Sequence, residues 1–315
     1  MAVIAMDLGA TKLAIAIFGE NGSIEHKEIF LLFRRQGKEV GELVGQSLNK
    51  LLEVADEREL NIEGIGVCVP GIWYRKKGVV WAPNIPGWEN YPLLEEMQLA
   101  LGKRSIPIQI DSDRSCYILG ETWLGAAKGS ENAIFLAVGT GIGAGIMVDG
   151  HIVRGSSDIG GAIGWLALER PFKDIWKSCG CFEYQASGEG IARMARYYVS
   201  ETLDYQGELS TKSLDQIHTR DVFEAWKNSD LIAERVIRNC IELWGMTVAN
   251  LVSLFNPEKI IFGGGVFGPA AQFLPDIYEY AALWAQPISI REVKLEVSLL
   301  GGDAGLIGAG RLARN

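Results

Sequence analysis

Glycine clusters constrain this chain more than any other sequence feature. It has 38 glycines among 315 residues, whereas average usage of about 7% would give roughly 22. The clusters span residues 139–145, 160–164, 263–265 and 301–305, and they lack the every-third-residue period of collagen. Since glycine has no side chain to keep a ligand away, we expect these segments to bring bare backbone close to one.

A strand, a tight glycine turn and a second strand occur twice along the chain. The first copy spans residues 3–18 and the second spans residues 133–148, which suggests duplicated halves. This order of elements indicates a mixed α/β protein of two sheet domains with a cleft between them. The apolar patterns predict further strands at 24–30, 65–69, 106–110, 151–153, 259–262 and 293–299, and helices at 39–57, 116–124, 185–198, 221–226, 230–255, 269–284 and 303–313.

Composition argues against several classes of partner. The formal charge of −9 supplies no overall cationic field, so we expect no nucleic-acid partner. No apolar run approaches the ~20 residues needed to cross a bilayer, and the N-terminus resembles a strand rather than a signal peptide. We therefore expect no membrane partner and a cytoplasmic protein. The five cysteines are scattered and odd in number, which favours reduced thiols.

Two glycine turns have the chemistry of phosphate sites. In the first, Gly9 frees backbone N–H groups, the Thr11 hydroxyl adds a donor and Lys12 adds positive charge. Asp7 ends the preceding strand, where a carboxylate could hold Mg²⁺ through water. The second turn, at residues 139–141, offers the same cradle. An ordinary hairpin is the alternative for either turn alone, but it is less favoured for two turns at matching places.

A third glycine cluster, at residues 263–265, follows a buried strand and precedes a predicted helix. A bare strand-to-helix turn at the carboxyl edge of a sheet is where a flat nucleobase can lie against backbone. Close helix–strand packing is the alternative, and it explains one glycine more readily than three. The residues predicted to bind the nucleotide are Asp7, Gly9, Thr11, Lys12, Gly139, Thr140, Gly141, Gly263, Gly264 and Gly265.

These motifs resemble those of the ROK family of sugar kinases, which includes glucokinases, fructokinases and N-acetylhexosamine kinases. The resemblance implies an actin/hexokinase-like ATPase fold with ribonuclease H-like sheets and an interdomain cleft. It implies a small N-terminal domain of residues 1–112 plus about 300–315, and a large C-terminal domain of residues 113–299. The matching segments are the phosphate motifs at 7–12 and 136–143, the sugar-side loop at 83–88, the segment 111–121 and the adenosine motif at 260–265.

Asp113 takes the place of the family's general base. The resemblance implies that it removes the proton from the attacking sugar hydroxyl while ATP and Mg²⁺ supply the phosphoryl group. The alternative is that Asp113 only caps the helix predicted near Cys116. The resemblance implies sugar-binding roles for Gly71, Asn84, Ser112, Asp113, Ala162, Trp165 and Glu183.

Two of these positions depart from the family pattern. The family carries Glu and His where this chain has Ala162 and Trp165. The change removes hydrogen bonds to sugar hydroxyls that are worth about 1.5–3 kcal/mol each where a charge is involved. We therefore expect intact phosphoryl transfer with altered recognition, of a less polar, substituted or larger sugar packed on Trp165, Trp88 or Trp73. Core packing is the alternative for each tryptophan.

The family's zinc ligands are mostly missing. Only Cys181 falls on a ligand position, Asp174 and Trp176 occupy two others, and Cys179 is displaced. Because structural Zn²⁺ needs four well-placed ligands, we predict a zinc-less variant with free thiols.

The leading interpretation is an ATP- and Mg²⁺-dependent kinase that phosphorylates a sugar, at O6 of a hexose or hexose derivative. A catalytically silent sugar-binding or regulatory protein is the alternative, because the family Glu and His are absent. The family's transcriptional repressors carry a helix-turn-helix segment ahead of the first phosphate motif. Here that motif begins at residue 7, so we do not expect a repressor. Dimers are common in the family, which makes a homodimer a further expectation.

Overall fold

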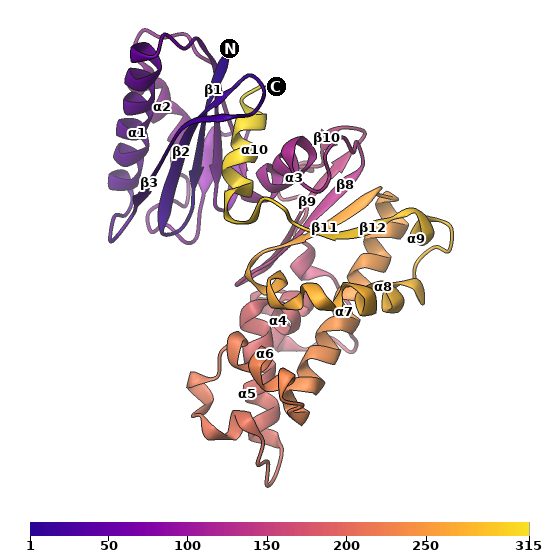
Figure 1. Cartoon of the computed structure of the whole chain (residues 1–315). Helices are drawn as coiled ribbons and strands as arrows, with labels where there is room; N and C mark the ends of the chain where they lie inside the picture. The colour runs from indigo at the N-terminus through magenta and orange to yellow at the C-terminus, as the bar shows by residue number, and fades with distance from the viewer. Residues whose placement is uncertain (315) are drawn as a thin grey trace. The chain divides into compact units, whose positions relative to one another are not determined.

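The computed structural model describes residues 1–314, which form two compact units. Unit 1 contains residues 1–129, 152–160 and the segment from Leu299 to the C-terminus, and unit 2 contains residues 130–151 and 161–298. Each unit is built around a five-stranded sheet with helices packed on it (Figure 1). The alternation of apolar strands and amphipathic helices in the sequence thus produces the predicted α/β class.

The sheet of unit 1 has the strand order β3-β2-β1-β4-β7. β1 pairs antiparallel with β2 and parallel with β4. β1 and β2 are buried along almost their whole length, as continuous apolar runs require when both faces of a sheet are covered. The strands are β1 (Ala2–Leu8), β2 (Lys12–Gly19), β3 (Ile24–Leu31), β4 (Ile62–Val69) and β7 (Ile108–Ser112).

Helices cover both faces of this sheet (Figure 1). On one face, α1 (Lys38–Glu57) contacts α2 (Leu93–Leu101); on the other, α3 (Asp113–Leu124) packs against α10 (Ala304–Leu312). α1 forms because its apolar residues recur every three or four positions, and that row is buried. α10 comes from the far end of the chain and lies against β1 and β4.

The sheet of unit 2 repeats the same order, β10-β9-β8-β11-β12. β8 pairs antiparallel with β9 and parallel with β11, as β1 does with β2 and β4. Each glycine turn therefore follows the central strand of its sheet, in agreement with the expected duplication. The strands are β8 (Ala133–Val138), β9 (Ile142–Val148), β10 (His151–Ile152), β11 (Lys259–Gly263) and β12 (Lys294–Val297).

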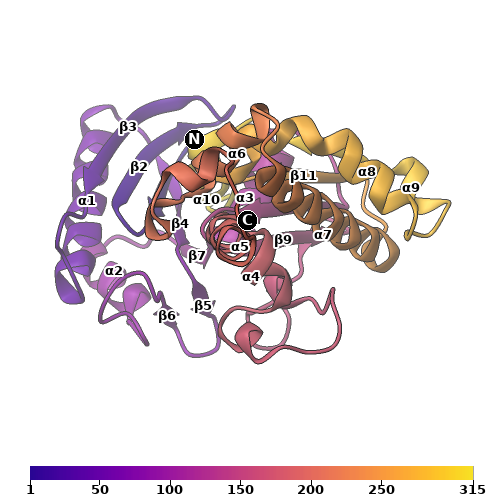
Figure 2. The same ribbon diagram turned by 90° about the horizontal axis from the view of Figure 1, so that it is seen from below.

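The helices of unit 2 gather around one long helix. α7 (Leu231–Phe255) begins where the Asp230 carboxylate accepts the N–H groups of Ile232 and Ala233, and it lies beside α8 in both views (Figure 1; Figure 2). Of the helices among residues 1–314, none is both long and apolar enough to cross a membrane. The others are α4 (Cys181–Ala186), α5 (Gly188–Glu201), α6 (Thr219–Lys227), α8 (Leu274–Ala282) and α9 (Ser289–Glu292).

Some elements differ from those expected. The segment 185–198 is divided at Ser187, whose hydroxyl accepts the Gly190 N–H at 3.0 Å and so caps α5. The segment 269–284 starts as a 3₁₀ turn, and α8 begins only at Leu274, with a proline in its first turn, where the missing N–H costs little. The short strands β5 (Ile72–Tyr74) and β6 (Val79–Trp81) were not predicted.

The bounds of the two units differ from a division at residue 112. α3 packs against α10 and therefore belongs with the first sheet, which extends unit 1 to Gly129. The segment 152–160 joins the same unit through ion pairs described below. The division into a small and a large domain stays a prediction.

Candidate active site

The turn between β1 and β2 holds the first predicted phosphate site. The Gly9 N–H donates to the Lys12 carbonyl at 2.8 Å and closes the turn, while Thr11 is exposed at its tip. Asp7, at the end of β1, is half-buried; burial raises the pKa of its carboxyl, against a hydrogen bond from Cys68 and the charge of Lys12. The structure thus places these predicted residues on one turn.

A glycine at the start of α10 makes room for the Asp7 carboxylate. A Cβ on Gly305 would lie 2.7 Å from an oxygen of Asp7, closer than a Cβ atom comes to another heavy atom. The donor set at this turn is one carboxylate beside open backbone. That set fits Mg²⁺, which prefers one or two carboxylates together with water and substrate phosphates.

Asp113 is the first residue of α3, so the helix begins three residues earlier than predicted. The cap is Ser112, whose hydroxyl accepts the Ser115 N–H at 3.4 Å. The alternative that Asp113 caps the helix is therefore wrong. Asp113 is half-buried and accepts the Arg114 N–H at 2.8 Å, and burial raises the pKa of its carboxyl to about 6. A carboxylate with a pKa near neutrality is suited to accepting a proton.

An ion pair that the sequence did not reveal fixes the strand before Asp113. Asp111 is buried and accepts both the Ser112 N–H at 2.8 Å and the Arg154 Nε at 2.7 Å. Asp158 accepts the Arg75 Nε at 2.6 Å in the same unit. Buried carboxylates are retained when they are paired in this way. The only signal in the sequence was the charged residue Asp111 directly after the apolar strand predicted at 106–110.

The tryptophan of the predicted sugar-side loop, residues 83–88, packs in the core of the protein. The Trp88 ring is buried and stacks on the Tyr91 ring, with 4.2 Å between the ring centroids. Its Nε1 donates to the Gly37 carbonyl at 2.9 Å. Trp73 is also buried. Packing of a sugar on Trp88 or Trp73 is therefore wrong, because both rings fill the core. Asn84 is exposed.

Gly71 is fixed by close packing. It has a φ of +131°, and a Cβ there would lie 2.2 Å from the Trp81 carbonyl oxygen. The position therefore needs glycine for the pairing of β5 with β6 whatever else it binds.

The second glycine turn, between β8 and β9, is held by three backbone N–H groups. The Gly139 N–H donates to the Gly141 carbonyl at 2.9 Å, and the Gly188 N–H donates to the Gly139 carbonyl at 2.7 Å. The Ile142 N–H donates to the Glu183 carboxylate at 2.7 Å. Burial raises the pKa of Glu183, and this hydrogen bond opposes the rise. The predicted sugar ligand Glu183 therefore also holds the second glycine turn in place.

A pocket of about 700 Å³ adjoins this turn. Its walls come from Gly139 and Thr140, the first residues of α5, one face of α6 and the turn after β11. The volume lies in the usual range for cofactor sites, and the wall combines bare backbone with apolar and charged side chains. The lining residues used below are Thr140, Glu189, Arg220, Phe223, Gly265 and Val266.

The three glycines after β11 have different roles. Gly263 packs on the Phe135 ring, which a Cβ would meet at 2.2 Å. Gly264 has a φ of +88° and lies against the Val138 carbonyl. Only Gly265 faces open space and lines the pocket. The structure therefore brings Gly265 together with Gly139 and Thr140 in the pocket wall. Gly263 instead allows the Phe135 ring to pack closely on the backbone.

Ala162 and Trp165 lie on one short turn beside Glu183. The Trp165 N–H donates to the Ala162 carbonyl at 3.2 Å, and a Cβ on the intervening Gly164 would lie 2.9 Å from the Glu183 Cβ. Ala162 is half-buried, but the Trp165 side chain is 58% exposed. Trp165 is thus the one tryptophan of the three named above that is available to a ligand.

The segment that corresponds to the family's zinc ligands, residues 174–181, has no preformed ligand set. Asp174 is exposed, Trp176 and Cys181 are buried, and Cys179 is half-buried. Over residues 1–314, no three His, Cys, Asp or Glu side chains gather as a metal site. Zinc-free folding stays a prediction.

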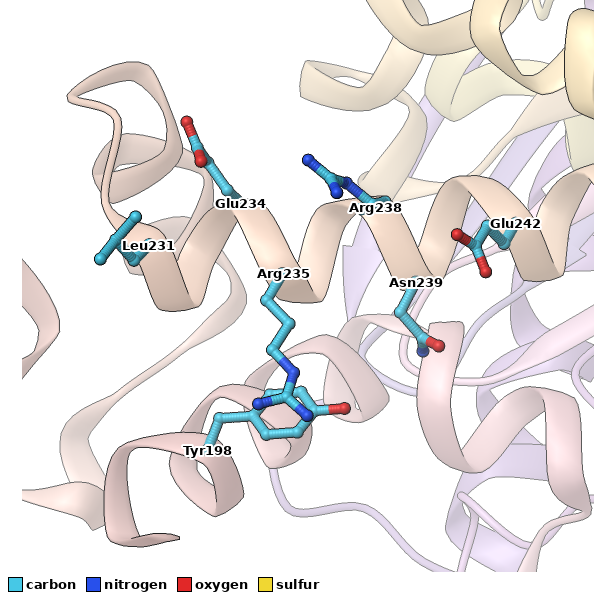
Figure 3. Close-up of a pocket in the computed structure, with 7 residues that line it drawn as sticks. All are labelled: Tyr198, Leu231, Glu234, Arg235, Arg238, Asn239 and Glu242. Carbon is cyan, nitrogen blue, oxygen red and sulfur yellow. The ribbon is translucent and has the colours of Figure 1, made fainter. Parts of the chain in front are cut away.

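A second pocket, of about 310 Å³, lies where the start of α7 faces α5. Figure 3 shows the Arg235 guanidinium over the Tyr198 ring, 3.9 Å from its centroid. The rest of the lining comes from α7 and is polar except for Leu231; it includes Glu234, Arg238 and Glu242. It contains none of the predicted site residues.

Comparison with known sequences identifies relatives along the whole chain. A profile described as "ROK family" matches residues 3–315. A glucokinase from Halalkalibacterium halodurans is 31% identical over 99% of this chain and 94% of its own length. A xylose repressor from Caldicellulosiruptor bescii is 30% identical over 97% of this chain and 76% of its own length.

Solved structures share the fold. A ROK hexokinase from Thermus thermophilus superposes with a TM-score of 0.81 and 29% identity, covering 100% of this chain and 98% of that one. A ROK-family glucokinase from Streptomyces griseus, in complex with glucose and AMPPNP, has a TM-score of 0.74 and 26% identity, covering 100% and 99%. The units described above therefore have the actin-like ATPase fold.

Proposed function

Because this chain belongs to the ROK family, we propose that it is an ATP-dependent sugar kinase that phosphorylates O6 of a hexose or hexose derivative, with Asp113 as the general base. The kinase class rests on the full-length similarity to glucokinase and hexokinase. The observation that carries the finer proposal is the half-buried Asp113 carboxyl at the start of α3, directly after β7, with a pKa raised to about 6.

Unit 2 binds the nucleotide in this proposal. The Thr140 hydroxyl would donate to phosphate oxygens, and the first residues of α5, Gly188 and Glu189, lie in the wall of the same pocket. Phe223 and Val266 are buried apolar walls against which a base can lie. The glucokinase from Streptomyces griseus was solved with AMPPNP, which supports ATP as the donor.

Unit 1 supplies the groups that act on the hydroxyl and the metal. Asp113 would accept the proton of the sugar hydroxyl, and the Asp111–Arg154 pair holds its strand in place. Asp7 would hold Mg²⁺ through water, and the ion would neutralise charge on the phosphates. Thr11, Lys12 and the Gly9 turn would bind phosphate oxygens.

Sugar recognition is altered in this proposal because Ala162 and Trp165 stand where the family has Glu and His. The exposed Trp165 ring offers an apolar face, and the residue before it, Gly164, packs on Glu183. Such a surface suits a sugar with an apolar or bulky substituent. Gly71, Asn84, Ser112 and Glu183 keep their proposed sugar-binding roles.

A substrate panel tests both levels of the proposal. ADP release should be measured with hexoses, N-acetylhexosamines, pentoses and glycosides at fixed ATP. We expect turnover of at least one substituted sugar, and a higher KM for plain glucose than for that sugar. Micromolar affinity for glucose would contradict altered recognition. Absence of turnover on every sugar, with ATP binding intact, would favour the silent sugar-binding protein.

The pH dependence follows from the pKa of Asp113. The base works only when deprotonated, so kcat/KM should rise with pH until it passes about 6, the pKa of this group, and then level off. One unit below that pKa, about a tenth of the molecules carry the ionised form. Initial rates from pH 5 to 8 in buffers of constant ionic strength measure this. A profile that stays flat from pH 5 to 7 would exclude this assignment.

A further inference from the structure

We propose that Arg220 binds the phosphate chain of the nucleotide. The inference rests on the proposed function, since it takes the pocket of unit 2 as the ATP site. Arg220 is the second residue of α6, is exposed and lines that pocket with Thr140 and Gly265. It lies outside every motif that carries the family resemblance.

Two hydrogen bonds fix the start of α6 to the glycine turn. The Thr219 hydroxyl donates to the Gly188 carbonyl, and the Gly188 N–H donates to the Gly139 carbonyl at 2.7 Å. Arg220 follows Thr219 directly, so its side chain starts from the end of the pocket at which the turn lies.

The helix itself is anchored at the same point. The His218 N–H donates to the Asp221 carboxylate at 2.8 Å as part of a capping box. Asp221 is in turn paired with Lys212 at 2.7 Å. The backbone that carries Arg220 is therefore fixed before any ligand binds, which lowers the entropy lost when the side chain engages one.

Charge balance distinguishes Arg220 from the other ionic residues of the pocket. Glu189 is paired with Arg196, and Glu224 with Lys227, each at 3.0 Å. Across residues 1–314, Arg220 has neither a hydrogen-bond nor an ion-pair partner. A guanidinium binds two phosphate oxygens at once, so a polyphosphate is the ligand class that completes this site.

Arginine also stacks on flat rings, and stacking on the nucleobase is the competing role. The apolar wall that suits a base is made by Phe223 and Val266. The two roles separate in a binding experiment, because adenosine has the base without the phosphates.

The test is calorimetric titration of the full chain with ADP and with adenosine. We expect Arg220→Gln to weaken ADP binding by about tenfold to a hundredfold, as loss of a charge-assisted hydrogen bond does, and to leave adenosine binding unchanged. Arg220→Lys keeps the charge without the planar fork and should recover part of the loss. The difference in ADP affinity should shrink as salt is raised.

Arg238→Gln is the matched control, since Arg238 is an exposed arginine of the same unit that lines the other pocket; its ADP affinity should equal the wild type. Equal ADP affinity in Arg220→Gln and the wild type would overturn the proposal. So would equal losses for ADP and adenosine, which indicate stacking. If the wild type itself fails to bind ADP, the proposed function fails first, and Arg220 loses its role with it.

Discussion

Asp113→Asn should lower kcat by about 10²–10⁴-fold, the usual contribution of a general base. The amide keeps the shape of the carboxyl and cannot take the proton from the sugar hydroxyl. The Arg114 N–H can still donate to the side-chain oxygen, as it does to Asp113 at 2.8 Å. We therefore expect KM for ATP to stay near its wild-type value. ADP release at saturating sugar and pH 8 measures the loss.

Stability separates a chemical loss from misfolding. Burial raises the pKa of Asp113, so the folded protein binds this proton more tightly than the unfolded chain does. Above pH 6 the ionised carboxylate therefore costs folding free energy, and a neutral Asn removes that cost. Urea unfolding at pH 7 should show Asp113→Asn at least as stable as the wild type. Undiminished turnover in this variant would remove Asp113 as the base.

Gly308→Ala should destabilise the protein by about 1–3 kcal/mol, the usual cost of overpacking. Gly308 lies in α10, and a Cβ there would lie 1.8 Å from the Cys116 carbonyl oxygen in α3. Backbone cannot rotate away as a side chain can, so one helix must shift. Helix propensity alone would favour alanine over glycine by about 1 kcal/mol. The predicted change in the free energy of unfolding therefore has the opposite sign to that of the same substitution at an exposed helical site.

Gly302→Ala is the matched control for this effect. No described atom lies within 4 Å of a Cβ at Gly302, so its free energy of unfolding should stay within about 0.5 kcal/mol of the wild type. Thermal and urea unfolding of both variants measure the difference. Wild-type stability in Gly308→Ala would mean that α3 and α10 are farther apart than the structure places them.

Long periodic segments were predictable from sequence. The continuous apolar runs of β1 and β8 are long enough to indicate buried strands, and the apolar row of α1 is long enough to show its helical period. β5 and β6 have three residues each, too few for a period to appear. Their pairing depends on Gly71 meeting the Trp81 carbonyl, which is a tertiary contact.

The sequence predicted which residue types form the candidate site, but it did not predict which of those residues face the pocket or the solvent. The sequence presents Gly263 and Gly265 as equivalent, yet the first packs on Phe135 and only the second lines the pocket. Trp88 and Trp165 likewise share one chemistry, and only burial distinguishes them. The Asp111–Arg154 pair joins residues 43 positions apart, a separation that local patterns do not encode.

The last helix of the chain gives unit 1 an unusual order of assembly. β1 and β4 leave the ribosome early, but α10, which lies against both, is synthesised much later. All of unit 2 is translated before that helix. Unit 2 is thus free to fold while the face of the first sheet that α3 and α10 share is still only partly covered, which departs from the usual N-terminal-first order. The Asp7 turn gains its neighbour Gly305 only with α10, so the packing around this carboxylate is completed after unit 2 has been translated.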